Sequence, residues 1–220
     1  MFVGHYAAAL AAKAAEPRAP LWAYVGACQL LDIGWSGLVI GGVEKLRIDP
    51  SLPGSGLDLY DMPFTHSLPG SLAISLAAAL AARWAMRLPW RAAALIGLVV
   101  FSHWLLDLLV HRPDLELFPG GPKVGLGLWN LPGPELALEM GLVAIAAGAW
   151  TFQRRAQGRS LWPALGFLSA LVVLQVVDEM GGGGGQPTGM ALTALAAYLV
   201  ATALAWLTER RPPGDATRPA

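Results

Sequence analysis

The sequence predicts an all-α protein: a polytopic transmembrane helix bundle of about six spanning helices preceded by a short N-terminal helix. Two features of the composition support this prediction. Hydrophobic residues make up 55% of the 220 residues and charged residues only 14%, whereas soluble domains carry about 25% charged residues. In addition, apolar stretches long enough to cross a bilayer recur along the whole chain. These observations indicate an integral membrane protein.

A helix needs about 20 mainly apolar residues to cross the bilayer. The stretches that meet this requirement are residues 21–43, 64–86, 92–110, 135–150 with its flanks, 161–177 and 189–207. Residues 2–15 are apolar but only about three to four turns long, so they form either a short span or an interfacial helix. Lys13 follows this apolar stretch instead of preceding it, which argues against a cleaved signal peptide.

Basic residues predict the orientation of the bundle. Eleven of the 15 Lys and Arg residues fall on one side of the predicted spans, and four fall on the other: Lys45, Arg47, Arg112 and Lys123. Because cytoplasmic loops carry the excess of basic residues, we expect a bacterial-type inner (cytoplasmic) membrane protein with a cytoplasmic C-terminus. Residues 1–210 form a single transmembrane domain, and 211–220 form a short cytoplasmic tail. Two Gly- and Pro-rich loops, 44–63 and 112–134, lie on the outer side, and the glycines at 181–185 form a connector.

Charge and cysteine content exclude two classes of protein. Lys plus Arg and Asp plus Glu both number 15, and a nucleic-acid binder needs a basic surplus. The single cysteine, Cys28, excludes a disulfide scaffold and a cysteine-based zinc finger. We therefore expect the lipid bilayer, and no nucleic acid, as a partner.

Ionisable side chains lie in the predicted spans, although each costs about 2.5–3.5 kcal/mol to insert. Asp32, His103 and Asp107 lie within spans, and Glu139 lies one turn into the 135–150 span. His103 and Asp107 are four residues apart and share a helix face. This pair could bind a divalent ion, or it could be a buried ion pair that holds two helices together.

The wider set of such residues favours a metal site. Its members come from four segments: His5, Asp32, His66, His103 and Asp107. His66, His103 and Asp107 fall in the outer half of the bilayer and Asp32 near its middle, and His5 joins them on the outer side if residues 2–15 span. Imidazole and carboxylate ligands together suit zinc, with manganese or iron as alternatives, and we expect one or two ions. Asp32 or Glu139 would accept a proton from water, although Glu139 could instead be an extra ligand or a structural group.

Two basic residues of the outer loop are candidates for substrate binding. Arg112 and Lys123 lie in the 112–134 loop, next to the outer end of the span that carries His103 and Asp107. Their charges could bind an anionic group such as a phosphoester.

Several motifs resemble the membrane-bound metal-dependent hydrolase family, the YdjM-like inner-membrane hydrolases. They are Gly4-His5, Leu31-Asp32, Thr65-His66-Ser67 and Ser102-His103-Trp104-x-x-Asp107. The stretch from His111-Arg112-Pro113-Asp114 to Leu128-Trp129-Asn130 is similar to a closer subgroup. The similarity covers most of the chain to about residue 150, and it implies a hydrolase that uses a metal ion.

A second resemblance concerns only the order of the ligands. His, Asp, His and then His-x-x-x-Asp resembles the order in zinc-dependent phospholipase C and the related single-strand nucleases. Asp107 occupies the position of the carboxylate that bridges two zinc ions in those enzymes. This chain departs from them because it has no downstream His-x-x-x-Glu and begins with Met1 where they have a ligating Trp. The resemblance therefore implies one or two ions and not three.

The sequence thus predicts a membrane-embedded metal-dependent hydrolase with an extracytoplasmic-facing site, acting on a phosphoester of a lipid or lipid-linked substrate. One alternative is a transporter or permease whose intramembrane His and Asp residues bind a proton or ion in transit. The chain has no internal repeat to support that alternative. The other is a non-catalytic membrane scaffold in which His103 and Asp107 only clamp two helices.

Overall fold

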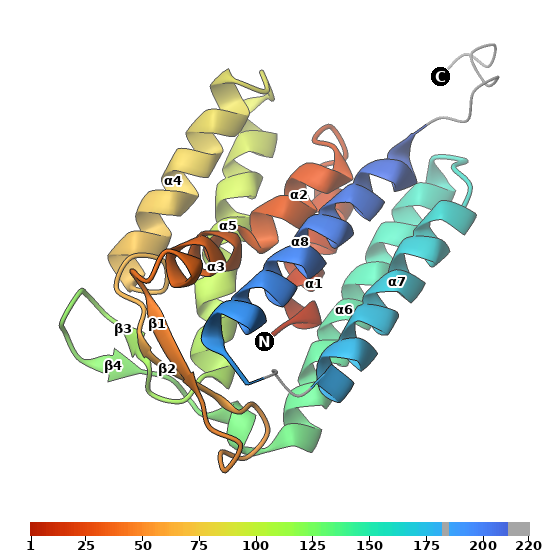
Figure 1. The fold of residues 1–220 in the computed structure, drawn as a ribbon. Helices are drawn as coiled ribbons and strands as arrows, with labels where there is room; N and C mark the ends of the chain where they lie inside the picture. Colours follow the sequence, from red (N-terminus) through yellow and green to blue (C-terminus); the bar gives the residue numbers. More distant parts are fainter. Residues whose placement is uncertain (182–184, 211–220) are drawn as a thin grey trace.

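The computed structural model describes residues 1–181 and 185–210, so the predicted tail 211–220 and glycines 182–184 of the predicted connector lie outside the described residues. The fold is an all-α bundle with two small antiparallel sheets (Figure 1). The predicted fold class is therefore confirmed.

Short elements form the first part of the chain. They are the 3-10 helix η1 (Val3–His5), α1 (Tyr6–Ala15), α2 (Leu21–Cys28), α3 (Leu30–Ile40) and the hairpin of β1 (Lys45–Ile48) and β2 (Leu57–Asp61). Longer helices follow, with a second hairpin between them. They are α4 (Leu68–Trp84), α5 (Trp90–Val110), β3 (Leu115–Glu116), β4 (Lys123–Val124), the 3-10 helix η2 (Leu128–Asn130), α6 (Pro132–Ala156), α7 (Trp162–Gly181) and α8 (Pro187–Glu209).

The number of spanning helices is lower than the predicted six. Four helices in the described residues, α5, α6, α7 and α8, are long and apolar enough to cross a membrane. A fifth span requires α2 and α3 together, which are bent by 51° at Gln29. The remaining candidate, α4, has 17 residues. It begins at Leu68 and not at residue 64, because Ser67 caps it by accepting a hydrogen bond from the Gly70 N–H.

The first helix is neither a span nor an interfacial helix. With ten residues α1 is too short to cross a bilayer, and most of its side chains are buried against α2 and α6. Its alanines allow this close packing, since small side chains let helix backbones approach one another. The N-terminal segment therefore forms the centre of the bundle.

The helices surround α1 in two groups (Figure 1). The α4–α5 pair lies on one side and α6, α7 and α8 lie on the other, with α1 and α2 between them. The α4–α5 contact is tight, because a Cβ atom added at Gly97 would lie 2.9 Å from the Ser75 carbonyl oxygen. Both hairpins gather at one end of the bundle, where α5 ends and α6 begins. The predicted site residues lie toward this end.

Candidate metal centre

Asp107 of α5 is surrounded by imidazoles on both of its carboxylate oxygens. Its Oδ2 lies 3.1 Å from Nε2 of His103 and 3.6 Å from Nε2 of His66. Its Oδ1 lies 3.1 Å from Nε2 of His5 and 3.4 Å from Nε2 of His111. Four histidines from three parts of the chain thus face a single carboxylate.

Asp32 supplies the second carboxylate. Its Oδ1 lies 3.3 Å from Nε2 of His66 and 3.4 Å from Nε2 of His103. Two sets of three side chains therefore have ligand atoms within 4.8 Å of one another: His5, His103 and Asp107, and Asp32, His66 and His103. The structure brings all five sequence-predicted ligands together around His103, and it adds His111.

The cluster is buried, and many of its polar atoms lack hydrogen bonds. The four imidazoles and Asp107 are at most 5% exposed, while Asp32 keeps 15% exposure. Within residues 1–181 and 185–210, the atoms without a hydrogen-bond partner include both ring nitrogens of His5, Nε2 of His103 and both oxygens of Asp107. Buried polar groups are almost always satisfied, so these atoms fit a bound cation.

In three histidines, Nδ1, the ring nitrogen that does not face the carboxylates of Asp32 and Asp107, contacts another group. Nδ1 of His103 lies 2.7 Å from the Cys28 carbonyl, and Nδ1 of His111 lies 2.9 Å from Asp114. Nδ1 of His66 lies 2.8 Å from the Thr65 hydroxyl, which itself donates to Glu44. Such partners fix the ring so that Nε2 is free to bind a metal.

Local structure explains how each ligand reaches the centre. His103, Asp107 and His111 are spaced by four residues at the end of α5 and form one stripe. Asp32 lies in the first turn of α3, where the helix dipole favours a carboxylate. The break at Gln29 also leaves the Cys28 carbonyl at the end of α2 without a helical partner, so it can accept a hydrogen bond from His103.

Three aromatic residues support the cluster; Trp104 and Trp129 occur in the motifs of the family resemblance without an assigned role, and Tyr198 was not singled out from the sequence. The Tyr198 hydroxyl of α8 donates to Asp32 Oδ2 over 2.9 Å. Trp104 Nε1 donates to the His66 carbonyl, and the Trp129 ring stacks on His111 with centroids 4.0 Å apart. A Tyr or Trp in or near a span is common, so the sequence offers no specific signal for these contacts.

Glu139 is buried beside the N-terminal segment. Its Oε1 accepts a 2.6 Å hydrogen bond from the Phe2 N–H, while its Oε2 has no partner among the described residues. Glu139 belongs to neither set of three potential ligands. The amino nitrogen of Met1, next to Phe2, lies 3.6 Å from Asp107 Oδ1. The N-terminal residues Met1 and Phe2 therefore lie between Glu139 and the Asp107 cluster.

The two predicted substrate-binding residues make contacts with the 44–63 loop. Arg112 donates to the carbonyls of Pro53, Ser55 and Leu57, and Lys123 donates to the carbonyl of Tyr60. Arg112 also donates to the Asn130 side chain. These bonds tie the 44–63 and 112–134 loops together at the end of α5, so both side chains hold the loop structure beside the cluster.

The electrostatics of the centre favour positive charge. His111 lies just beyond the last residue of α5. Burial alone would lower the pKa of His111, but the carboxylates of Asp107 and Asp114 raise it above its usual value. The two carboxylates therefore stabilise a proton or a metal ion at this position.

Comparisons with protein-family models, with curated proteins and with solved structures each return no match for this chain. The resemblance to the membrane-bound metal-dependent hydrolases therefore stays a prediction, and the function is argued from the geometry of the centre.

Proposed function

We propose that this protein is a membrane-embedded metal-dependent hydrolase that acts on a phosphoester of a lipid or lipid-linked substrate. The observation that carries this proposal is the convergence of buried imidazole nitrogens on the Asp107 carboxylate at 3.1–3.6 Å, where several of these atoms make no hydrogen bond within the described residues. A divalent ion between them would satisfy these atoms, and leaving buried polar atoms without a hydrogen bond is unfavourable.

The residues fit a divalent cation of the zinc type. Two sets of three side chains, which share His103, would each hold an ion: Asp32, His66 and His103, or His5, His103 and Asp107. Mixed nitrogen and oxygen ligands suit zinc, manganese or iron. A divalent ion held by these residues would supply Lewis acidity and would lower the pKa of a water molecule at the site toward neutrality.

The protein side chains would position the reactants and move the proton. Asp32 is the most exposed ligand, so the substrate would approach on its side of the cluster. Its Oδ2, which already accepts a hydrogen bond from Tyr198, can accept a proton from the attacking water. The unpartnered Oε2 of Glu139 is the second acceptor. Arg112 and Lys123 would act by fixing the outer loops over this centre.

The test begins with metal content. The full chain is purified in detergent without added metal and analysed by mass spectrometry of the elements. We expect one or two equivalents of transition metal per chain. Phosphate or headgroup release from dispersed phospholipids and polyprenyl phosphoesters should then disappear on chelation and return with zinc.

Two other results would each favour a different function. Bound metal without release of product, together with ion or proton uptake into reconstituted vesicles, would favour the transporter. Protein without stoichiometric metal would favour the scaffold.

The side on which the centre opens is tested separately. The basic residues favour a cytoplasmic C-terminus, so a reporter fused at the end of the chain should be active only in the cytoplasm. A reporter active only outside would place the centre at the cytoplasmic face.

A further inference from the structure

The two loops at the end of the bundle that carries the candidate metal centre have opposite surfaces. The 44–63 loop exposes charge: Lys45 of β1 is 54% exposed in its pair with Asp61 of β2. Residues 112–131, here called the α5–α6 segment, instead expose large apolar side chains. Those of Phe118, Leu126 and Leu131 are each more than half exposed.

The charged side chains of the α5–α6 segment bond to the protein itself. Asp114 contacts His111, and Glu116 accepts from the Gly120 N–H. Arg112 and Lys123 donate to carbonyls of the 44–63 loop. The segment thus uses its charges internally and turns apolar groups outward, which is the arrangement expected where the surroundings are of low polarity.

Backbone hydrogen bonds place Leu126 at the end of a membrane-spanning helix. Its N–H donates to the Leu108 carbonyl of α5 over 2.8 Å, and the Gly127 N–H donates to the His111 carbonyl over 2.7 Å. In a continued helix the Leu108 carbonyl would accept from residue 112, so the Leu126 N–H takes that place. With 21 residues, α5 is about 31 Å long, close to the hydrocarbon thickness of a bilayer. Leu126 therefore lies where acyl chains meet headgroups.

Leu126 also continues the lipid-facing stripe of α5. Positions 105, 109 and 112 share one face of a helix, because residues three or four apart align. Leu105 and Leu109 are 47% and 37% exposed on this spanning helix, so lipid covers them in a membrane. Leu126 follows them at the place of residue 112 and is 72% exposed. The paired N–H groups of Leu126 and Gly127 meet the requirement that backbone near the hydrocarbon be satisfied.

Two glycines allow the chain to lie this close to α5. A Cβ atom added at Gly125 would lie 2.1 Å from the Arg112 carbonyl oxygen, so a larger residue would displace the strand. Gly127 has a φ of 73°, in the left-handed region that glycine adopts without strain. The sequence Gly125-Leu126-Gly127 therefore presents a single leucine at the end of the helix.

The second exposed apolar group lies at the tip of a hairpin. Figure 1 shows the β3–β4 hairpin projecting to the side of the bundle from the end of α5. Its turn begins at Phe118, whose carbonyl accepts from the Gly121 N–H over 2.7 Å. The hairpin therefore extends the apolar surface of the α5–α6 segment away from the helices.

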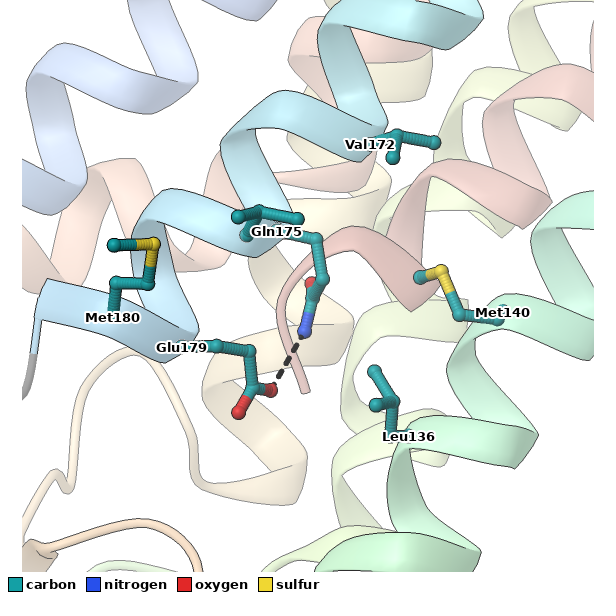
Figure 2. Close-up of a pocket in the computed structure, with 7 residues that line it drawn as sticks. Leu136, Met140, Val172, Gln175, Glu179 and Met180 are labelled. Atoms are coloured by element: carbon teal, nitrogen blue, oxygen red, sulfur yellow. Dashed lines mark hydrogen bonds between the residues drawn. The ribbon is translucent and has the colours of Figure 1, made fainter.

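The same distribution of polar and apolar groups occurs on two spanning helices. Figure 2 shows Leu136 and Met140 of α6 and Val172 of α7 around a groove between these helices. The polar side chains beside them bond to each other, because the Gln175 amide donates to Glu179 over 3.1 Å. The α5–α6 segment thus resembles the membrane-facing surface of the bundle more than it resembles the 44–63 loop.

We propose that the α5–α6 segment is an interfacial anchor, embedded between the headgroups and acyl chains of the leaflet at this end of the bundle. Leu126 and Phe118 contact acyl chains, and the 44–63 loop lies in water. Trp129 of the same segment stacks on His111 with centroids 4.0 Å apart, so the anchor holds the Asp107 cluster at the membrane boundary. This role requires neither metal nor hydrolysis, so it stands independently of the proposed function.

The experiment measures the depth of fluorescent probes attached to introduced cysteines. Native Cys28 is only 1% exposed, so it should not react. Phe118→Cys and Leu126→Cys test the anchor, Leu105→Cys marks the lipid face of α5, and Ser51→Cys marks the exposed 44–63 loop. Each full chain is labelled with an environment-sensitive dye and reconstituted in vesicles of phosphatidylcholine and phosphatidylglycerol.

Two quenchers report the surroundings of each probe. One is phosphatidylcholine brominated on its acyl chains near the headgroup, and the other is iodide on both sides of the vesicle. We expect the brominated lipid to quench the probes at 118 and 126 several-fold more than the probe at 51. Iodide should quench the probe at 51 several-fold more than the other two.

A glycine variant tests how the segment is held. Gly125→Ala should force the strand away from Arg112 and make the probe at 126 more accessible to iodide. Gly133→Ala is the matched control, since a Cβ atom there meets no atom within 4 Å, and it should change nothing. The probe at 105, measured in both backgrounds, reports whether α5 remains in the bilayer.

Three results would overturn the proposal. Strong quenching by iodide at 118 and 126, without quenching by brominated lipid, would place the segment in water. Equal quenching by brominated lipid at 51, 118 and 126 would remove the difference between the two loops. Protection from both quenchers, together with disulfide cross-links between two Leu126→Cys chains, would make this surface a contact between copies of the protein.

Discussion

Two buried polar clusters lie toward opposite ends of the bundle, and they differ in how completely their atoms are used. At one end Lys13 Nζ lies 2.7 Å from Glu209 Oε1 and donates to the carbonyls of Pro17 and Ala19. Glu209 Oε2 accepts from the Leu21 N–H. The three ammonium donors and both carboxylate oxygens thus have partners. At the other end, the atoms around Asp107 converge, and both Asp107 oxygens and Nε2 of His5 and His103 make no hydrogen bond within the described residues.

The comparison shows that burial of charge alone does not identify a binding site. The lysine cluster joins α1 to α8 and contains its own countercharge, so it is complete. The histidine cluster contains two carboxylates, and the Met1 amino nitrogen and four imidazoles lie around them. What separates a structural clamp from a ligand site is the set of unsatisfied, converging atoms.

The largest expected effect is the loss of metal affinity in the Asp107→Asn variant. Asn keeps the volume but supplies no negative charge to a divalent ion. Affinity should fall by more than about 100-fold, since loss of an outer partner alone costs about 10–100-fold. The helices should still insert and fold, because an amide is cheaper to bury than a carboxylate. Metal content and thermal stability in detergent are measured together.

A matched control is Glu209→Gln, which makes the same change in the lysine cluster and should leave metal content unaltered. If Asp107→Asn kept its metal and melted at a lower temperature, the Asp107 cluster would be a helix clamp.

The second-largest effect is expected for Lys13→Met, which should lower the free energy of unfolding. This change leaves the Glu209 carboxylate without its cation. We expect a loss of about 3 kcal/mol, at the lower end for a broken buried pair, because Glu209 keeps 15% exposure. Metal affinity should not change. Denaturant unfolding in detergent provides the measurement.

Lys45→Met is the exposed counterpart, since Lys45 is 54% exposed in its pair with Asp61, and it should cost less than about 1 kcal/mol. Equal losses of stability in Lys13→Met and Lys45→Met would contradict the interpretation of the lysine cluster as a structural clamp with all its polar atoms paired.

A smaller change in metal affinity is expected for Thr65→Val. The Thr65 hydroxyl connects Glu44 to Nδ1 of His66, so its loss frees the His66 ring to rotate. We expect an affinity decrease of about tenfold, typical of an outer partner, with the ion still bound at saturation. Titration of apo-protein with zinc measures it. Thr208→Val is the control, because that hydroxyl donates only to a carbonyl of its own helix.

The smallest effect concerns pH and lies outside both clusters. Hydrogen bonds from the Arg18 guanidinium hold the pKa of Glu16 at about 2, below its usual value of 4.5. Because the folded-state pKa is depressed, the stabilisation is complete above pH 4.5 and is lost as the pH falls toward 2. Wild type and Glu16→Gln should therefore differ in stability at pH 6 and converge as the pH falls toward 2. A difference that grows on acidification would refute this assignment.

The spans and most ligands could be predicted because they leave strong local signals. A run of about 20 apolar residues is unambiguous, so the predicted 92–110 and 189–207 spans match α5 and α8 closely. His103 and Asp107 stand out because charged or polar side chains are costly inside such runs. His111 continues their spacing at the end of the helix, but it was not included among the predicted ligands.

Other features depend on contacts between distant segments, which the sequence does not reveal. Glu44 reads as a solvated loop residue, yet it is 1% exposed and accepts hydrogen bonds from the Phe64 and Thr65 N–H groups. No proline at Gln29 predicts the bend there. Its side chain donates to the Phe2 carbonyl, so the N-terminal segment, not the local sequence, stabilises the bend.

The bend also makes the candidate site depend on elements that are distant in the chain. Helices α2 and α3, with 8 and 11 residues, are each too short to cross a bilayer alone. A straight helix would use the Cys28 carbonyl internally, whereas in the bent segment this carbonyl lies 2.7 Å from Nδ1 of His103 in α5. The bent form of the segment is therefore coupled to the docking of α5. Because Asp32 lies in the first turn after the bend, its place in the cluster is set by the same tertiary contact.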